Sequence, residues 1–246
     1  MSDAEPVIEL AILVALKEEA AGVRAAIKSL PESQQSRIRL AQGGVGAAMA
    51  ASAAQKLAHT PGIRCICSTG FCGGLDPVLP VGGIFLPTQI VAWADDKAAQ
   101  TFSLNDSTTQ RVLNAFNAAN LNVQTGTLAT VINPVFKVEE KHALGKAAGA
   151  QGVDMESAAV ARVTVEKNLE FFALRTVSDG ANDALPDEVG TFLSVEGKVR
   201  IGNVTKFALG GPRNIRELWR LGQRSREATQ SLEAAWKSVL PVLLTR

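Results

Sequence analysis

The stretch Gly152-Val-Asp-Met-Glu-Ser-Ala-Ala-Val160 places two carboxylates at the start of an apolar helix predicted over residues 153–166. A second stretch, Arg175-Thr-Val-Ser-Asp-Gly180, places Asp179 just past the hydrophobic run 171–177, which is typical of a buried strand. Ligand sites of α/β proteins form where strands end and helices begin. A carboxylate buried there costs desolvation energy unless it has a partner or a function. We therefore expect chemistry near these two stretches.

Apolar runs alternate with alanine-rich or amphipathic segments along the chain. Strands are predicted over residues 7–16, 38–41, 63–68, 81–87, 89–93, 125–132 and 171–177. Helices are predicted over residues 20–30, 47–57, 110–120, 137–149, 153–166 and, in up to two segments, 214–244; residues 95–107 and 181–190 are expected to be polar loops. This alternation predicts an α/β fold with a mainly parallel sheet and helices on both faces. No repeat or domain boundary is visible, so we expect a single domain over residues 1–246 with a basic helical region at about 212–246.

The composition narrows the functional class. The chain has 246 residues, of which 46% are hydrophobic, and a net charge of +1, which gives no general electrostatic case for nucleic-acid binding. Three clustered cysteines, Cys65, Cys67 and Cys72, favour reduced core thiols over a disulfide framework. Two histidines and no paired Cys-x-x-Cys argue against a zinc site. The short acidic segment 1–6 does not resemble a signal peptide, and the run 10–16 is too short to span a bilayer, so we expect a cytoplasmic protein.

Three glycine-rich turns follow predicted strands, at residues 43–46, 70–74 and 82–83. Glycine lets the backbone approach a ligand closely and aim N–H groups at it. None of the three matches a dinucleotide-binding or P-loop pattern. Each alone is more typical of a tight turn, but their recurrence at strand ends favours a binding site.

The three carboxylates carry different expectations. Asp154 is expected to stabilise the first turn of the helix, where an acidic residue satisfies free N–H groups. Glu156 precedes small residues that let a helix pack closely, and a buried carboxylate there could accept hydrogen bonds from two sugar hydroxyls. Asp179 is either a cap for the following turn or a functional acid.

Five motifs in register resemble the purine nucleoside phosphorylase and methylthioadenosine/adenosylhomocysteine nucleosidase superfamily. They are residues 15–19 (ALKEE), 43–46 (GGVG), 69–75 (TGFCGGL), 153–160 (VDMESAAV) and 175–179 (RTVSD). The resemblance covers roughly residues 7–183. It implies a three-layer α/β/α sandwich with a mixed, mostly parallel sheet, at least a homodimer, and no metal or cofactor.

Within this superfamily the chain is most similar to the hopanoid-associated phosphorylases, the adenosylhopane nucleosidases. The similarity lies in residues 74–77 (GLDP), the early Glu156-Ser157 and the C-terminal stretch 211–221 (GPRNIRELWRL). It implies release of adenine from 5′-adenosylhopane. The alternatives are a methylthioadenosine/adenosylhomocysteine nucleosidase, a phosphate-dependent purine nucleoside phosphorylase, and a nucleoside-binding protein without catalysis. The intact Glu19, Glu156 and Asp179 argue against the last.

The resemblance also implies roles for individual residues. Asp179 would protonate N7 of the purine, and Glu19 would position the attacking water. Glu156 would hold the ribose hydroxyls while Met155 packs against the sugar. The other residues expected in the pocket are Phe71, Cys72, Gly73, Phe136, Val153 and Ser178, with Gly44 and Gly46 in the ribose or anion loop.

Two substitutions relative to the phosphorylases favour hydrolysis. Phe71 stands where the family's glycine loop carries a serine, and Ser68 stands where the hexameric phosphorylases carry an arginine. Glu19 would in addition repel phosphate.

The C-terminal region combines basic and apolar residues. Arg213, Arg216, Arg220, Arg224 and Arg226 cluster with Leu218, Trp219 and Leu221. The commoner explanation is a solvated helix face over an ordinary core. The alternative is a peripheral contact with an anionic membrane, since a basic amphipathic helix with a tryptophan can lie at such an interface. A hopane-linked substrate would be embedded in lipid, so the two ideas support each other.

Overall fold

The computed structural model describes residues 8–104, 107–192, 194 and 196–245. The acidic segment 1–6 and Val7, the first residue of the first predicted strand, lie outside the described residues. Within them the chain forms one eight-stranded sheet. Its strands are β1 (Leu10–Val14), β2 (Ile38–Gln42), β3 (Cys65–Gly74), β4 (Ile84–Ala94), β5 (Lys97–Ser103), β6 (Val123–Thr130), β7 (Gly152–Asp154) and β8 (Glu170–Asp179).

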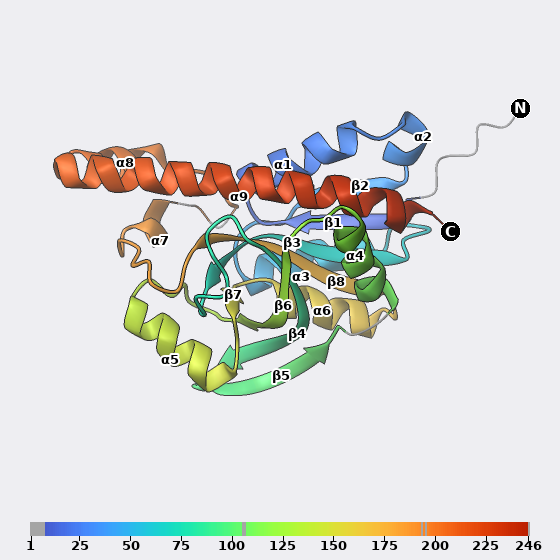
Figure 1. The fold of residues 1–246 in the computed structure, drawn as a ribbon, viewed down its shortest axis with the longest axis horizontal. Coiled ribbons are helices and arrows are strands. Elements are labelled where there is room, and N and C mark those ends of the chain that lie inside the picture. The colour runs from blue at the N-terminus through green and yellow to red at the C-terminus, as the bar shows by residue number, and fades with distance from the viewer. Residues whose placement is uncertain (1–7, 105–106, 193, 195, 246) are drawn as a thin grey trace, which may run out of the picture.

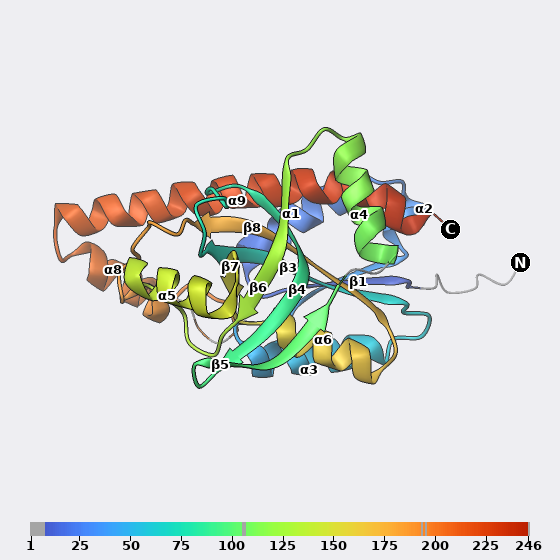
Figure 2. The same ribbon diagram turned by 60° about the horizontal axis from the view of Figure 1, so that its bottom comes forward.

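Nine helices are described: α1 (Lys17–Lys28), α2 (Glu32–Gln35), α3 (Ala47–Ala58), α4 (Ser107–Ala118), α5 (Val138–Ala148), α6 (Ser157–Glu166), α7 (Val189–Phe192), α8 (Ile201–Ala208) and α9 (Pro212–Leu244). Helices α1, α4 and α9 cover one face of the sheet, and α3 and α6 cover the other (Figures 1 and 2). Each face has its own apolar core. Trp236 of α9 packs with Phe172 of β8 on the first, and Val160 of α6 packs with Ile66 of β3 on the second.

The sheet is mixed but mostly parallel. Parallel pairs join β1 to β2 and β3, β8 to β3, and β6 to β4 and β7. Antiparallel pairs join β3 to β7 and β4 to β5 and β8. Together with the helices on both faces, this confirms the expected three-layer α/β/α sandwich.

Part of the sheet closes into a ring. Strand β3 pairs with β8, β8 with β4, β4 with β6, β6 with β7, and β7 again with β3. The ring brings the ends of β3, β7 and β8 together, because Gly73 is the register partner of both Val153 and Asp179. The stretches 152–160 and 175–180, which are separate in the sequence, therefore meet at one point of the fold.

Several predicted boundaries were wrong, each for a physical reason. The helix predicted over residues 153–166 begins only at Ser157, because residues 152–154 form β7. Residues 97–103, predicted as a loop, form the edge strand β5, whose largely exposed side chains account for its polar sequence. The two strand pieces at 81–87 and 89–93 are one strand, β4, and the C-terminal region is one continuous helix that starts at Pro212, a residue suited to the first helical turn.

None of the described helices combines the length and the apolar composition needed to cross a bilayer.

Candidate active site

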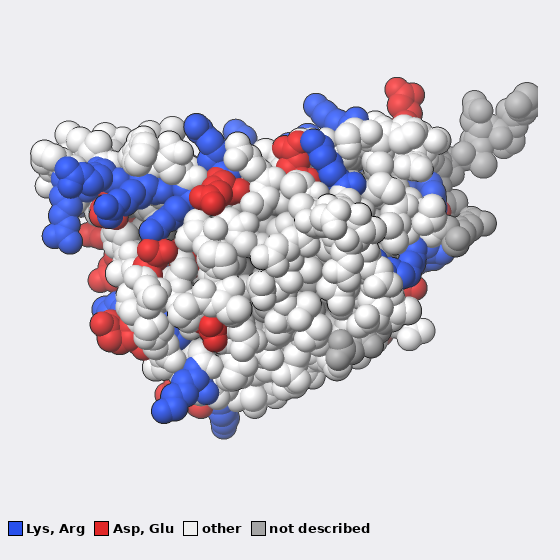
Figure 3. Space-filling model, viewed as in Figure 1, with Lys and Arg blue, Asp and Glu red and all other residues white. Residues whose placement is uncertain are grey.

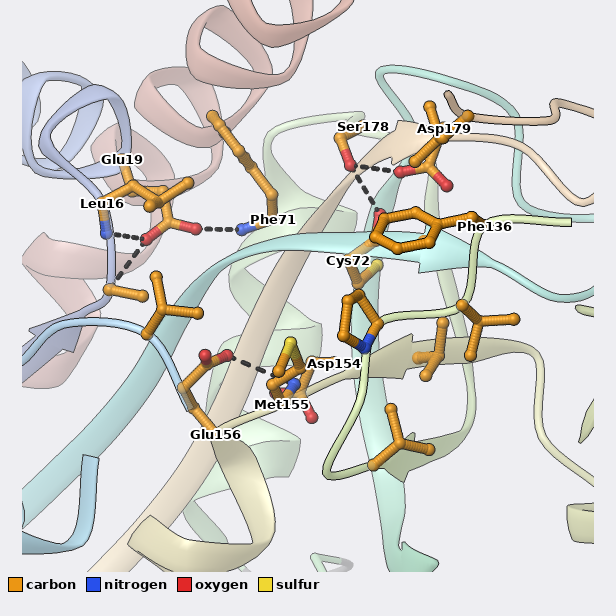
Figure 4. A pocket seen from close by; sticks show the side chains of 18 residues that line it. Leu16, Glu19, Phe71, Cys72, Phe136, Asp154, Met155, Glu156, Ser178 and Asp179 are labelled. Atoms are coloured by element: carbon orange, nitrogen blue, oxygen red, sulfur yellow. Dashed lines mark hydrogen bonds between the residues drawn. The ribbon is translucent and has the colours of Figure 1, made fainter. Parts of the chain in front are cut away.

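A cavity of about 180 Å³ lies where β3, β7 and β8 end. Its walls include ten residues predicted from the sequence: Glu19, Phe71, Cys72, Gly73, Phe136, Val153, Met155, Glu156, Ser178 and Asp179. Figure 4 shows Glu19 and Glu156 on one side and Ser178 with Asp179 on the other. The two predicted glycines Gly44 and Gly46 do not line this cavity. The site therefore has two ends, each built around carboxylates.

Glu19 lies in the first turn of α1, and backbone N–H groups hold both of its carboxylate oxygens. Its Oε2 accepts hydrogen bonds from the amides of Ala15 and Leu16, each at 2.8 Å, and its Oε1 accepts one from Phe71 at 2.7 Å. The side chain is almost fully buried. Burial raises the pKa of Glu19, while these N–H groups oppose the rise. The carboxylate is fixed in place and can take up a proton.

Gly70 makes room for that carboxylate. A Cβ atom built at Gly70 would lie 2.3 Å from Oε1 of Glu19, and its φ of +147° is one that side-chain-bearing residues rarely adopt. The second glycine stretch of the sequence is thus not a loop. It is the end of β3, where the backbone passes directly against Glu19.

Glu156 sits immediately before α6. Its Oε1 accepts a hydrogen bond of 2.7 Å from the N–H of Gly46, which has a φ of +92°. Burial, followed by repulsion from Asp154, raises the pKa of Glu156 to about 7. The first glycine turn therefore orients Glu156, and Gly44 lines a second, very small cavity behind it together with Arg175.

Asp154 has the structural role expected of it, with a partner that the sequence did not reveal. Its Oδ2 accepts a 3.0 Å hydrogen bond from the N–H of Ser157, the first residue of α6. The same oxygen accepts a 2.5 Å bond from Nη2 of Arg175, and Thr130 donates to Oδ1 at 2.6 Å. Asp154 therefore stabilises the start of α6 and forms an ion pair with Arg175.

Arg175 is a site residue that sequence reasoning missed, although an arginine inside the apolar run 171–177 was a usable signal. It is 2% exposed, and its Nη2 also donates to Ser68 and Ser157. Burial opposes its charge, but the carboxylates around it, led by Asp154, raise the pKa of Arg175 above its ordinary value. Among the described residues its Nε has no hydrogen-bond partner. Arg175 is a fixed positive charge beneath the Glu19 and Glu156 end.

The opposite end of the cavity contains Asp179, the last residue of β8. The hydroxyl of Ser178 donates to Oδ1 of Asp179 at 2.7 Å and lies 3.2 Å from the carbonyl of Cys72. The ammonium of Lys141 donates to Oδ2. Lys141 is fully buried in α5, a polar helix whose other residues, all of them described, are at least partly exposed, so nothing distinguished it in the sequence. Asp179 is therefore held by a hydroxyl and a buried cation.

Two groups of residues near the cavity have structural roles. Cys65, Cys67 and Cys72 are buried thiols, and burial raises the pKa of the Cys67 and Cys72 thiols, so the prediction of core thiols is confirmed. The carboxylate of Asp183, four residues after Asp179, accepts a hydrogen bond from the N–H of Gly180 and forms an ion pair with Arg224, so it stabilises a turn. In the described part of the chain no cluster of three or more His, Cys, Asp or Glu side chains has a metal-binding arrangement.

The geometry suits one kind of ligand. Paired carboxylates at one end can accept hydrogen bonds from a diol, Met155 and Phe136 supply apolar surface, and a single carboxylate at the other end can exchange a proton.

Similar folds occur among solved structures. Futalosine hydrolase of Helicobacter pylori has a TM-score of 0.73 at 16% identity, covering 97% of this chain and 99% of that one.

Two methylthioadenosine/adenosylhomocysteine nucleosidases also match. That of Helicobacter pylori has a TM-score of 0.71 at 16% identity, and that of Neisseria meningitidis, in complex with methylthio-immucillin-A, has 0.70 at 18%. In both comparisons 96% of this chain and 98% of the other are covered. A search of curated proteins by sequence gives no significant match. The family model of the phosphorylase superfamily matches residues 9–206, most of the chain, and the protein therefore belongs to the phosphorylase superfamily.

Proposed function

We propose that this protein is a nucleosidase that hydrolyses the N-glycosidic bond of a 5′-substituted adenosine and releases adenine. The observation that carries the proposal is the placement of Glu19 and Glu156 at one end of a single cavity and Asp179 at the other. Cleavage of this bond develops positive charge on the ribose and negative charge on the purine. The two ends match these two charges.

Each end has a defined task in the proposed reaction. The C1′–N9 bond breaks with its electron pair going to the purine, and Asp179 delivers a proton to N7 so that adenine leaves as a neutral molecule. Water attacks C1′ and gives its proton to Glu19, since burial raises the pKa of this carboxylate and so favours proton uptake. Glu156 accepts hydrogen bonds from the ribose hydroxyls, and its charge also favours the ribosyl cation.

The charges at the ribose end favour water over phosphate as the nucleophile. Glu19 and Glu156 both face the cavity, and the buried cation beneath them, Arg175, is already bound to Asp154. A phosphate dianion entering there would meet two carboxylates. Incubation of the pure protein with and without phosphate tests this. Adenine release without phosphate is expected, and strict phosphate dependence would contradict hydrolysis.

For the 5′-substituent we propose the hopane of 5′-adenosylhopane, which would place the protein in hopanoid side-chain formation. Apolar residues make up much of the cavity wall, among them Leu16, Val45, Val135 and Leu185. Comparison of rates on adenosylhopane, methylthioadenosine and adenosylhomocysteine tests the choice. Faster release from either small substrate would favour the alternative nucleosidase. An absence of turnover on all three would leave a binding protein.

A lipid-linked substrate fits a peripheral membrane contact by the projecting end of α8 and α9. This end exposes Ile201, Leu209, Ile215 and Trp219, each more than half exposed. Lysine and arginine side chains gather over the same end (Figure 3). A second copy applied to this surface would bring like charges together, whereas anionic lipid would complement them. We expect the protein to co-sediment with vesicles of anionic lipid but not of neutral lipid, and Trp219→Ser to lose this binding. Equal binding to anionic and neutral vesicles would contradict the proposal.

We also propose a homodimer, as the family resemblance implies. Ile132 is 70% exposed and lies on the loop after β6, whose residues Val131 and Pro134 line the cavity, so a partner could cover it beside the site. Sedimentation analysis should show a dimer that Ile132→Glu weakens. A monomeric wild-type protein would contradict the proposal.

A further inference from the structure

The contacts of Lys141 are unusual for a lysine. The side chain has no exposed surface, and its ammonium donates to three acceptors: Oδ2 of Asp179, the carbonyl of Gly180 at 3.0 Å and the carbonyl of Asp183 at 2.9 Å. An ammonium has three N–H groups, so each has a partner. A buried lysine is costly unless its charge is matched. The site therefore stabilises a proton on Lys141.

Only one of these three acceptors can take that proton. Carbonyl oxygens do not titrate in water, so a proton leaving Lys141 goes to Asp179. Asp179 in turn lines the cavity, whereas Lys141 does not. The pair therefore contains one transferable proton, and Asp179 is its route to a ligand.

We propose that Lys141 is the positioning residue that keeps the Asp179 acid supplied with its proton; this inference rests on the proposed nucleosidase function. The purine takes a proton at N7 as the C1′–N9 bond breaks, and Asp179 delivers it. The Lys141 ammonium passes one of its protons to Asp179 Oδ2 and becomes a neutral amine. Water adds to C1′ and its proton goes to Glu19, so that nucleoside and water give adenine and the free sugar. Exchange with solvent after product release restores Lys141 and Glu19.

The pairing has a consequence for pH. Among the described residues, the side chains that donate to the Asp179 carboxylate are Lys141 and Ser178. Without Lys141, Asp179 must take its own proton from solvent, which acidic conditions favour.

The test uses two substrates that differ in their leaving group. Adenine needs a proton to leave, but 4-nitrophenolate from 4-nitrophenyl β-D-riboside does not. We expect Lys141→Met to lower adenine release from the nucleoside that the wild type cleaves by about 100-fold at pH 8. The loss should shrink as pH falls, and the nitrophenyl riboside rate should change little. Equal losses on both substrates with an unchanged pH profile would show that Lys141 only supports the fold.

Two controls distinguish proton supply from a general effect of the substitution. Lys146→Met makes the same change at an exposed position of the same helix and should leave both rates unaltered. If Lys141→Met does not fold, Lys141→Arg takes its place, because an arginine keeps a positive charge beside Asp179 but does not give up its proton. Adenine release should fall in this variant while nitrophenolate release does not, and equal losses on both substrates would contradict the inference. A wild-type protein that releases no adenine from any nucleoside would instead refute the proposed function. This outcome differs from the failure of the inference, in which the wild type is active but Lys141 has no specific effect on adenine release.

Discussion

The two ends of the cavity handle charge in opposite ways. At the end proposed to hold the ribose, Glu19, Asp154 and Glu156 surround the buried cation Arg175, and several backbone N–H groups hold the carboxylates in place. At the base end, Asp179 faces the buried cation Lys141 through a direct contact. The first end places three carboxylates around one cation, whereas the second pairs one carboxylate with one cation. In the proposed reaction, the first end stabilises the cationic sugar and the second supplies a proton to the leaving base.

Removal of one carboxylate from each end should separate the tasks of the two ends most clearly. Glu19→Gln should lower the rate by about 10³-fold for both adenine and nitrophenolate leaving groups, since water must be activated in either case. Asp179→Asn should cause a similar loss for adenine only. Steady-state rates on both substrates measure this difference. Identical patterns in the two variants would mean that the ends do not have separate tasks.

Asp179→Asn also leaves the Lys141 ammonium without its counter-charge, which is expected to lower stability by roughly 3–5 kcal/mol. Rates should therefore be compared at a temperature where both variants are folded, with adenine binding as the check.

A second change disturbs the ribose end through the backbone. Gly70→Ala places a methyl group against the Glu19 carboxylate, so we expect about a 100-fold loss of kcat and a loss of roughly 1–3 kcal/mol of stability. Gly149→Ala is the matched control: its φ is +60°, but nothing lies within 4 Å of the added atom. That variant should lose about 1 kcal/mol and keep its rate. Full activity in Gly70→Ala would show that Glu19 need not stay where the structure has it.

The raised pKa of Glu156 predicts a pH effect on stability. The folded state holds the Glu156 proton up to about pH 7, whereas the ordinary pKa of a glutamate, as in the unfolded chain, is 4.5. Its contribution to stability is therefore complete below pH 4.5 and is lost as the pH rises to about 7. Relative to the wild type, Glu156→Gln should gain up to about 3 kcal/mol between pH 4.5 and about pH 8. Denaturant unfolding of both proteins at both pH values measures this change. A difference in the free energy of unfolding that stays constant with pH would refute the prediction.

The smallest effect is expected at Ser178. Its hydroxyl donates to Asp179, but Lys141 remains in place when it is removed, so Ser178→Ala should cost about 1 kcal/mol, roughly a five- to tenfold loss of rate for adenine. The pH profile should not move. A shift as large as that expected for Lys141→Met would mean that Ser178, rather than the lysine, controls the proton.

The sequence predicted most of this arrangement because its signals are local. Apolar runs marked the buried strands, and acidic residues beside strand ends marked the cavity. The short strand β7 was mistaken for helix because only its pairing with β3 and β6, far away in the chain, makes it a strand. Lys141 was missed for a similar reason. It lies in a helix that is otherwise not buried, and its partner Asp179 is 38 residues away.

The long helix α9 connects directly to the strand that carries Gly70. Trp236 of α9 donates from Nε1 to the hydroxyl of Thr69 at 3.1 Å, and Thr69 donates in turn to the carbonyl of Leu174 in β8. Chains are synthesised from the N-terminus, so Glu19 and all eight strands leave the ribosome before Trp236 does. The first core therefore closes only when α9 packs onto it. The strand end that holds Gly70 against Glu19 gains its contact with Trp236 last, after the rest of the sheet has been synthesised.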